Sequence, residues 1–339
     1  MRKKKYILFL VLGVCVSVLL SFGRETAEGR TVEEVGALPT RTTVLCVGLD
    51  AAAANTDVLM LLSLDGERKE ISVLQIPRDT YFSSETAQKK INQLYPRERL
   101  HGAAANGALS SLADSLSESL GVRIDGYLAL DLPAVAELID GLGGVRVKVP
   151  VPIRHRASDG DGYIEIPAGD VLLGGREAVE FLRFRAGYTE GDLGRVDAQK
   201  LLLAATYRKL REDMSLPVIL KLLSTLYGRA YTDMSLVEQA SLARAYYANR
   251  SEFKVNLLTL PGEAARGEES RGLSYYVVNR KGASEVLQRY FGGGTFDPKG
   301  RFLDGERPHF VNIYYDTAPS YTVYTEETLD GLDVKIKQK

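Results

Sequence analysis

Apolar residues are grouped along the chain in short continuous runs, and the turns between the runs predict strands. Runs at residues 42–48, 58–64 and 70–76 consist mostly of Val, Ile, Leu and Met. The Asp-Gly pair at residues 65–66, between the second and third runs, is typical of a hairpin turn. Strands that are apolar throughout are covered on both faces, so these runs indicate a sheet with helices on both sides.

The rest of the pattern alternates between helical and extended periodicity. We expect helices at residues 103–120, 133–142, 174–181, 194–211, 217–248 and 283–291, and strands at residues 126–130, 145–149 and 255–260. After Gly292, a composition rich in Gly, Pro, Tyr and Thr predicts an irregular or weakly attached tail. Strands and helices that alternate within one core predict the α/β class, as a three-layer α/β/α domain with a central mixed sheet.

A basic stub and a long apolar run open the chain. Four basic residues at positions 2–5 precede an uncharged run at residues 6–22. This run is at the short end of the about 17–25 residues that span a bilayer as a helix. The basic flank predicts a cytoplasmic N-terminus and an external remainder. The alternative is a cleaved signal peptide with a small-x-small triplet at residues 21–23, although the apolar region of such peptides is usually only about 7–15 residues long.

We therefore expect a single-pass protein of the cell membrane whose main domain is extracellular. The expected divisions are a cytoplasmic stub and transmembrane anchor at residues 1–23, a linker at 24–41, the extracellular domain at 42–291 and the tail at 292–339. An apolar content of 45% is that of a globular protein. A formal net charge of −1 provides no general basic field that would attract nucleic acid.

Several kinds of chemistry are excluded by what the sequence lacks. Cys15 falls in the anchor and Cys46 in a buried run, so no disulfide framework or CxxC metal site is expected. There is no G-x-S-x-G, Walker A or HExxH motif, and the three histidines do not have metal-ligand spacing. Acid, base and metal chemistry is therefore expected from carboxylates.

Arginine is concentrated around a glycine-containing loop at residues 182–195. Arg183 and Arg185 are two positions apart, which places them on the same side of an extended strand. Arg195 and Gln199 are four apart, which stacks them on one face of a helix that begins near Asp192. Guanidinium groups match phosphate oxygens two at a time, so this segment suits a doubly anionic ligand. Surface ion pairing is the competing interpretation.

Carboxylates and another arginine fall at the ends of predicted strands. Asp50 follows the first strand and Asp57 opens the second, so both can reach one rim of the sheet, where α/β folds commonly bind ligands. Such oxygen ligands suit Mg²⁺ or Mn²⁺ together with substrate phosphates. Pro77 ends the third strand and directs Arg78 to the same rim. Alternatively, Asp57 caps a turn, Asp50 is solvated, and Arg78 pairs locally with Asp79.

The order of these motifs resembles the LytR-CpsA-Psr (LCP) family. The resemblance rests on VGLD at 47–50, NTDVLML at 55–61, SVLQIPRDT at 72–80, KIN at 90–92, IDGLGGV at 139–145, LGGREA at 173–178, FLRFR at 181–185 and DLGRVDAQ at 192–199. It covers roughly residues 42–210 and continues more faintly through 260–263 and 274–277. Short pieces such as IPRD are weak alone, whereas their order and spacing together are specific.

The resemblance implies a membrane-anchored transferase in cell-wall biogenesis. Such an enzyme moves an anionic glycopolymer, such as teichoic acid or capsule, from a polyprenyl-diphosphate carrier to a muramic-acid hydroxyl of peptidoglycan. The implied diphosphate ligands are Arg78, Arg183, Arg185, Arg195 and Gln199, and the implied Mg²⁺ (or Mn²⁺) ligands are Asp50 and Asp57. Arg183 and Arg185 are also implied in catalysis with Asp192, which would orient the arginines or act as a base on the acceptor hydroxyl.

One position departs from the family pattern. Many members carry an arginine two residues before the aspartate that is Asp57 here, whereas this chain has Asn55 and a short loop. One cationic contact to the diphosphate would then be lost. Two further functions are therefore considered beside the phosphotransferase: a non-catalytic polyprenyl-diphosphate-binding or regulatory envelope protein, and a lipid diphosphatase. A transcriptional attenuator does not suit an external domain without a basic DNA-binding face.

Overall fold

The protein is described here from a computed structural model. The description covers residues 40–49, 56–157, 162–189, 191–213, 230–235, 252–266, 274–302 and 321–325, and positions 328, 332, 334 and 336–337. The predicted anchor at residues 6–22 lies outside this part of the chain. Among the residues that are described, no helix is long and apolar enough to cross a membrane.

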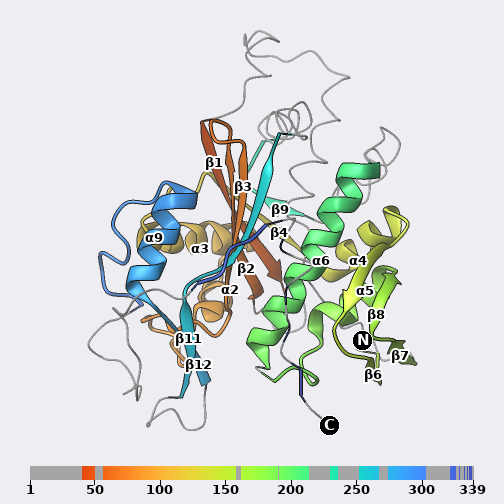
Figure 1. Cartoon of the computed structure of the whole chain (residues 1–339). Coiled ribbons are helices and arrows are strands. Elements are labelled where there is room, and N and C mark those ends of the chain that lie inside the picture. The colour runs from red at the N-terminus through yellow and green to blue at the C-terminus, as the bar shows by residue number, and fades with distance from the viewer. Residues whose placement is uncertain are drawn as a thin grey trace.

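A mixed sheet forms the centre of the domain (Figure 1), as predicted. Its strands, in spatial order, are β13 (Tyr324–Thr325), β10 (Lys254–Thr259), β3 (Glu70–Ile76), β2 (Thr56–Asp65), β1 (Arg41–Leu49), β4 (Gly126–Leu130) and β9 (Tyr231–Thr232). β2 is antiparallel to β1 and β3, whereas β1 is parallel to β4 and β3 to β10. The carboxyl ends of β1, β3, β4 and β10 and the amino end of β2 therefore share one edge, here called the carboxyl rim.

Helices cover both faces of the sheet (Figure 1). One face carries α2 (Leu94–Leu100), α3 (Ala105–Leu120) and α9 (Arg280–Phe291), and the other carries α4 (Leu132–Gly141), α5 (Gly175–Arg183) and α6 (Asp192–Asp213). Val44 and Cys46 of β1 belong to the core under α4, α5 and α6, and Leu45 and Val47 to the core on the other face. Burial on both faces explains why the predicted strands read as continuous apolar runs.

Shorter elements surround the sheet. A 3₁₀ turn, η3 (Ile91–Gln93), precedes α2. Two-stranded ladders are formed by β5 (Val145–Val149) with β8 (Gly169–Leu173), by β6 (Ile153–Arg156) with β7 (Tyr163–Ile166), and by β11 (Gly262–Arg266) with β12 (Ser274–Val278). The β11–β12 ladder continues from β10 past the carboxyl rim (Figure 1).

The sequence pattern located β1 to β5, β10, α3 to α6 and α9 to within a few residues, whereas η3, α2 and the strands β6, β7, β8, β11 and β12 were not predicted. The strands at 70–76, 126–130 and 145–149 are found at those bounds. The predicted hairpin joins β2 to β3, and the Asp65 carboxylate accepts the backbone N–H groups of Glu67 and Arg68. Burial raises the pKa of the Cys46 thiol, so this side chain is an inert core residue.

The helix expected at residues 217–248 is wrong for the part that is described. Residues 230–235 contain β9, which pairs with the edge of β4. The Thr232 hydroxyl donates to the Tyr127 carbonyl, and the Tyr127 N–H donates to the Asp233 carboxylate. These long-range hydrogen bonds to an open sheet edge outweigh local helical propensity. The rest of 217–248 is outside the described residues.

The described parts of the segment after Gly292 are attached to the domain. Phe296 and Phe302 are buried and stack with ring centroids 5.3 Å apart. β13 adds an antiparallel strand to β10. Ile336 forms a bridge with Tyr188. Aromatic anchors and edge pairing therefore hold this segment, which its composition alone did not indicate.

A glycine within α3 and the glycine that directly follows it should respond oppositely to alanine. Gly121 ends the helix with φ +63°, and a Cβ there would lie 2.2 Å from the Thr295 carbonyl oxygen. We expect Gly121→Ala to lower the free energy of unfolding by about 2 kcal/mol or more. Gly107→Ala, at an exposed position with no atom within 4 Å, should raise it by up to about 1 kcal/mol. Urea denaturation measures both, and a loss at Gly107 equal to that at Gly121 would contradict this account.

Candidate active site

The centre of the carboxyl rim is an ion pair between Arg78 and Asp57. Arg78 follows β3 after Pro77, and Asp57 is the second residue of β2. The Arg78 Nη1 donates to Asp57 Oδ1 at 2.7 Å, and the side chains are 21% and 26% exposed. The Nε of Arg78 is 4.0 Å from Asp79 Oδ2. The expected convergence of Arg78 and Asp57 is confirmed, and the closer carboxylate belongs to the neighbouring strand rather than to the adjacent residue.

The turn that carries Arg78 is held by backbone hydrogen bonds from two other segments. The Tyr276 N–H of β12 donates to the Asp79 carbonyl at 2.9 Å. The Asn92 N–H of η3 donates to the Arg78 carbonyl at 3.3 Å, and the Asn92 carbonyl accepts the Thr56 hydroxyl at 3.2 Å. Asn92 thus links the end of β3 to the start of β2, so the two halves of the ion pair are fixed relative to each other.

Lys90 forms an ion pair with the carboxylate of Asp79. The Lys90 side chain is buried, and its Nζ lies 2.8 Å from Asp79 Oδ1 and 5.3 Å from the ring centroid of Tyr275. A cation–π contact and an ion pair together fix a flexible lysine. Asp79 is therefore neutralised by Lys90, which explains why Arg78 reaches across to Asp57.

α6 presents Arg195 and Gln199 beside the rim. The helix begins at Asp192, as predicted, and both side chains are buried, at 7% and 2% exposed. Gln199 donates to the Leu182 carbonyl at 3.3 Å and makes a long 3.5 Å contact with Gln75, the penultimate residue of β3. Gln199 therefore joins α6 to the end of α5 and to the strand that carries Arg78. Burial of Arg195 rules out the surface ion-pair interpretation for that residue.

Arg183 and Arg185 lie on the surface. The extended backbone predicted for this pair is wrong for Arg183. Arg183 is the last residue of α5, and extended backbone begins only at Phe184. The helix is longer than expected because the Phe184 N–H still donates to the carbonyls of Glu180 and Phe181. Arg183 and Arg185 are both exposed. The predicted arginine set therefore divides into a buried member on α6, a half-buried member at the rim and two exposed members at the end of α5.

The loop between Arg185 and α6 is anchored by a buried tyrosine. Tyr188 is fully buried, packs edge-to-face on Phe184 at 5.5 Å, and sits against Gly194, whose Cβ would lie 2.5 Å from the Tyr188 Cβ. Lys337 braces the same loop: its N–H donates to the Gly187 carbonyl at 3.0 Å and its Nζ to the Ala186 carbonyl at 2.9 Å. Burial raises the pKa of Tyr188 far above its ordinary value, so the phenol stays protonated.

Three of the predicted or noted positions are not described. Asp50 and Asn55 lie outside the described residues, and so does the side chain of Asp192. Asp50 directly follows Leu49, whose register partner across the β1–β2 ladder is Thr56. Within the described ranges, no group of three or more His, Cys, Asp or Glu side chains could hold a metal ion. Asp57 is thus the predicted metal ligand whose position is known.

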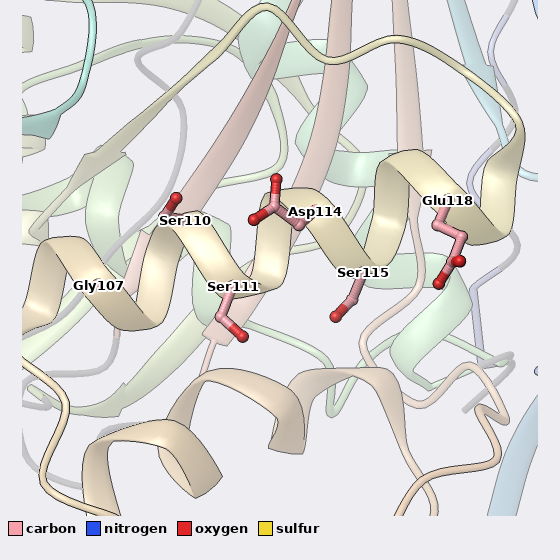
Figure 2. Close-up of a pocket in the computed structure, with 6 residues that line it drawn as sticks. All are labelled: Gly107, Ser110, Ser111, Asp114, Ser115 and Glu118. Carbon is pink, nitrogen blue, oxygen red and sulfur yellow. The ribbon is translucent and has the colours of Figure 1, made fainter.

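A hollow lies away from the rim, on the outer surface of α3 (Figure 2). Its volume is about 650 Å³, and the six residues that line it all come from this one helix: Gly107, Ser110, Ser111, Asp114, Ser115 and Glu118. They offer hydroxyls and two carboxylates, with no cation among them. The helix covers the face of the sheet opposite α6 (Figure 1). We therefore place the active site at the carboxyl rim.

Several contacts at the rim were not predicted from the sequence. Gln75 and Ser72 are two buried polar side chains inside the apolar run that precedes Arg78, and this departure from the apolar pattern could have marked Gln75. The pairing of Lys90 with Asp79 had no comparable signal, because it depends on how the loop before η3 folds back. The side-chain amide oxygen of Asn92 is buried and has no hydrogen-bond partner within the described part of the chain.

Comparison with known proteins identifies the class of protein that this fold and rim define. A model of the LytR_cpsA_psr family matches residues 24–291, most of the chain. The protein therefore belongs to the LytR_cpsA_psr family, which confirms the resemblance seen in its motifs.

Among its relatives, the polyisoprenyl-teichoic acid–peptidoglycan teichoic acid transferase TagU of Oceanobacillus iheyensis is 27% identical over 247 residues, 72% of this chain and 73% of that protein. The cell wall biosynthesis protein LcpA of Corynebacterium glutamicum is 24% identical over 292 residues, and the match spans 80% of this chain but about half, 54%, of that protein. Such names indicate a transferase in cell-wall glycopolymer attachment.

Solved structures share the fold. The crystal structure of B. subtilis TagV has a TM-score of 0.60 at 22% identity, covering 75% of this chain and 98% of that chain. The structure titled TagT bound to LIIa-WTA has a TM-score of 0.58 at 21% identity, covering 80% and 98%. At these identities the likeness establishes the α/β/α fold alone.

The buried phenol of Tyr188 gives a stability test of the arginine loop. Its hydroxyl is buried and has no hydrogen-bond partner in the described part of the chain. We expect Tyr188→Phe to leave the free energy of unfolding unchanged or to raise it by about 1 kcal/mol. Tyr188→Ala should lower it by about 3–5 kcal/mol, because it leaves a cavity. Urea denaturation distinguishes them; a loss above about 1 kcal/mol for Tyr188→Phe would show that the hydroxyl is bonded.

Proposed function

We propose that this protein is a Mg²⁺-dependent phosphotransferase that moves an anionic glycopolymer from a polyprenyl-diphosphate carrier to peptidoglycan. The observation that carries the proposal is the Arg78–Asp57 pair at the carboxyl rim, joined through Gln75 and Gln199 to the helix that bears Arg195. Two cations at one rim, one of them on a rigid helix, suit a ligand with two phosphate groups. The names of the relatives supply the class of donor and acceptor.

The reaction has simple requirements. The acceptor hydroxyl oxygen attacks the phosphorus next to the glycopolymer, the bond from that phosphorus to the bridging oxygen breaks, and polyprenyl phosphate leaves. The hydroxyl proton passes to a carboxylate, a role that suits Asp192. Phosphoryl transfer depends on positioning and on neutralising oxygen charge more than on covalent help. Arg78 and Arg195 would bind the diphosphate oxygens, and Gln199 would keep both elements in place.

Arg183 and Arg185 would complete the diphosphate site from its solvent side. Both are exposed, and the loop that follows them is braced by Tyr188 and Lys337. A braced loop holds exposed arginines near α6 at a low entropic cost on ligand binding. We therefore assign them to contacts that form when the substrate is present.

The residues at the rim have donor atoms that suit Mg²⁺, with Mn²⁺ as a substitute. Asp57 is partly exposed, and Arg78 engages one of its two carboxylate oxygens. Asn92, which links Arg78 to Thr56, has a buried amide oxygen without a partner among the described residues. These are hard oxygen donors, the type that Mg²⁺ prefers. Asp57 and Asp50 would hold the ion, which when bound neutralises charge on the diphosphate.

The proposal includes a place at the cell membrane. The apolar run at residues 6–22 and its basic flank would anchor the chain with the N-terminus in the cytoplasm and the domain outside. A polyprenyl carrier is confined to the bilayer, so an anchored domain meets it at high local concentration.

A second candidate is binding of the same lipid without turnover, which Asn55 favours because it replaces a cation at the short loop before β2. The two differ in a single measurement with purified protein, a polyprenyl-diphosphate glycopolymer and peptidoglycan. Transfer supports the enzyme, and binding without transfer supports the second candidate. Phosphate release in the absence of peptidoglycan would instead indicate a diphosphatase.

Arg195→Met should nearly abolish transfer. Methionine keeps most of the apolar volume, so the fold is expected to survive, whereas loss of one cation at developing negative charge should lower the rate about 100-fold or more. The matched control is Arg123→Met, at a side chain that is 89% exposed and paired with Asp125; it should transfer at the wild-type rate. Wild-type transfer by a folded Arg195→Met protein would overturn the assignment of this residue.

Metal removal should stop transfer, and Mg²⁺ should restore it. We expect Asp57→Asn to require at least about tenfold more Mg²⁺ for half-maximal transfer, because one anionic ligand is lost. Asp114→Asn, on the exposed face of α3, is the control and should keep the wild-type requirement. Transfer that persists at full rate in a chelator would exclude Mg²⁺ dependence.

A further inference from the structure

A small cavity lies beside the rim, between α6 and the strands β10 and β13. Its volume is about 180 Å³, and its walls include Asp197, Lys200, Thr259, Tyr276, Tyr321 and Tyr324. Thr259 is the register partner of Gln75 across the parallel β3–β10 ladder, and Lys200 follows Gln199 on α6. Neighbouring strands are about 4.8 Å apart, so the cavity is one strand away from the Gln75–Gln199 contact of the candidate active site.

The charged groups of this cavity neutralise each other. Lys200 is 3% exposed, and its Nζ lies 2.7 Å from Asp197 Oδ1 and 5.3 Å from the ring centroid of Tyr324. Asp197 itself is 28% exposed. A cavity wall of zero net charge gives no advantage to a phosphate. The pair nevertheless offers a donor and an acceptor to a neutral ligand, and apolar residues of similar size would stabilise the fold as well or better.

Aromatic rings and hydroxyls make up the rest of the wall. The Tyr276 hydroxyl donates to the Leu260 carbonyl at 2.6 Å, which fixes its ring. Tyr321 and Tyr324 are half-buried, and Thr322 between them is exposed. Tyrosine rings combine an apolar face with a polar edge, and sugar rings do the same. The volume is below the roughly 300–1,000 Å³ of drug-sized pockets, so it suits one ring.

We propose that this cavity is a sugar subsite that binds one uncharged, hydroxyl-bearing pyranose ring next to the diphosphate site. The inference rests on the proposed function and adds to it the recognition of a glycan by α6, β10 and β13. Asp197 and Lys200 would bond the ring hydroxyls, and Tyr321 would cover an apolar face. The ring could come from the carrier-linked donor or from the peptidoglycan acceptor, because both present the same chemistry.

The test compares three ligands on the full chain. Farnesyl diphosphate probes the diphosphate site alone, farnesyl-diphosphate-linked N-acetylglucosamine adds a donor sugar, and the amino-sugar disaccharide of peptidoglycan represents the acceptor. Affinities are measured by calorimetry for the diphosphates and by ligand-observed NMR titration for the disaccharide. The variants are Tyr321→Ala and Lys200→Met, and the matched control is Tyr163→Ala, at a tyrosine of β7 that is 80% exposed.

We expect Tyr321→Ala and Lys200→Met to weaken one of the two sugar-bearing ligands by about tenfold, with farnesyl diphosphate and the Tyr163→Ala control unchanged. Loss for the linked N-acetylglucosamine assigns the subsite to the donor, and loss for the disaccharide assigns it to the acceptor. If Lys200→Met does not fold, Tyr321→Ala decides, because its half-buried ring is removed without leaving a buried charge unpaired. Wild-type affinity for both sugar-bearing ligands in the folded variants overturns the subsite.

Failure of the proposed function would look different. In that case wild-type protein would not bind farnesyl diphosphate, or Arg195→Met would not weaken its binding. The disaccharide titration would still show whether the cavity holds a sugar, since that ligand has no diphosphate.

Discussion

The reversed direction of β2 between β1 and β3 determines where the chemistry of this fold can be placed. Because β2 is antiparallel to both neighbours, its first residues lie at the edge where β1 and β3 end. Asp57 is thereby set beside Arg78. A parallel strand at this place would have carried its first residues to the opposite edge. The antiparallel β2 thus places the Asp57 side chain at the rim where β1 and β3 end.

The ion pair itself contributes little to stability. Both side chains are about a quarter exposed, and pairs of this kind are worth about 0–1 kcal/mol. The stability of the domain comes from the two hydrophobic cores on the two faces of the sheet. These cores also hold the strand ends that form the rim. Backbone hydrogen bonds from Tyr276 and Asn92 hold the turn that carries Arg78, so its position does not depend on the ion pair. This is the arrangement expected of a site whose side chains are positioned before a ligand binds.

The sequence predicts the parts of the fold that are decided locally. β3, β4 and β5 were located at their bounds because β3 and β4 are mostly apolar runs, β5 alternates Val with basic residues, and each is followed by Pro or Asp. β9 and β13 were not predicted, because strands of two residues exist only through pairing with distant edges. Arg78 and Asp57 could be placed at one rim because they flank strands. The contact of Gln199 with Gln75, and the cavity that Lys200 lines, depend on how α6 lies over the sheet, which periodicity does not specify.

The bracing of the arginine loop by Lys337 has a consequence for the order in which the molecule is completed. The two hydrogen-bonded partners, Lys337 and Ala186, are 151 positions apart in the chain. Synthesis proceeds from the N-terminus, so β1 to β4 and both arginines of the loop are made well before the residue that braces it. The sheet can form early, whereas the loop between Arg185 and Arg195 reaches its final constraint late. The nascent domain can therefore have a folded sheet before its arginine loop is braced. The ability to bind a ligand at that loop would then arise after the sheet has folded.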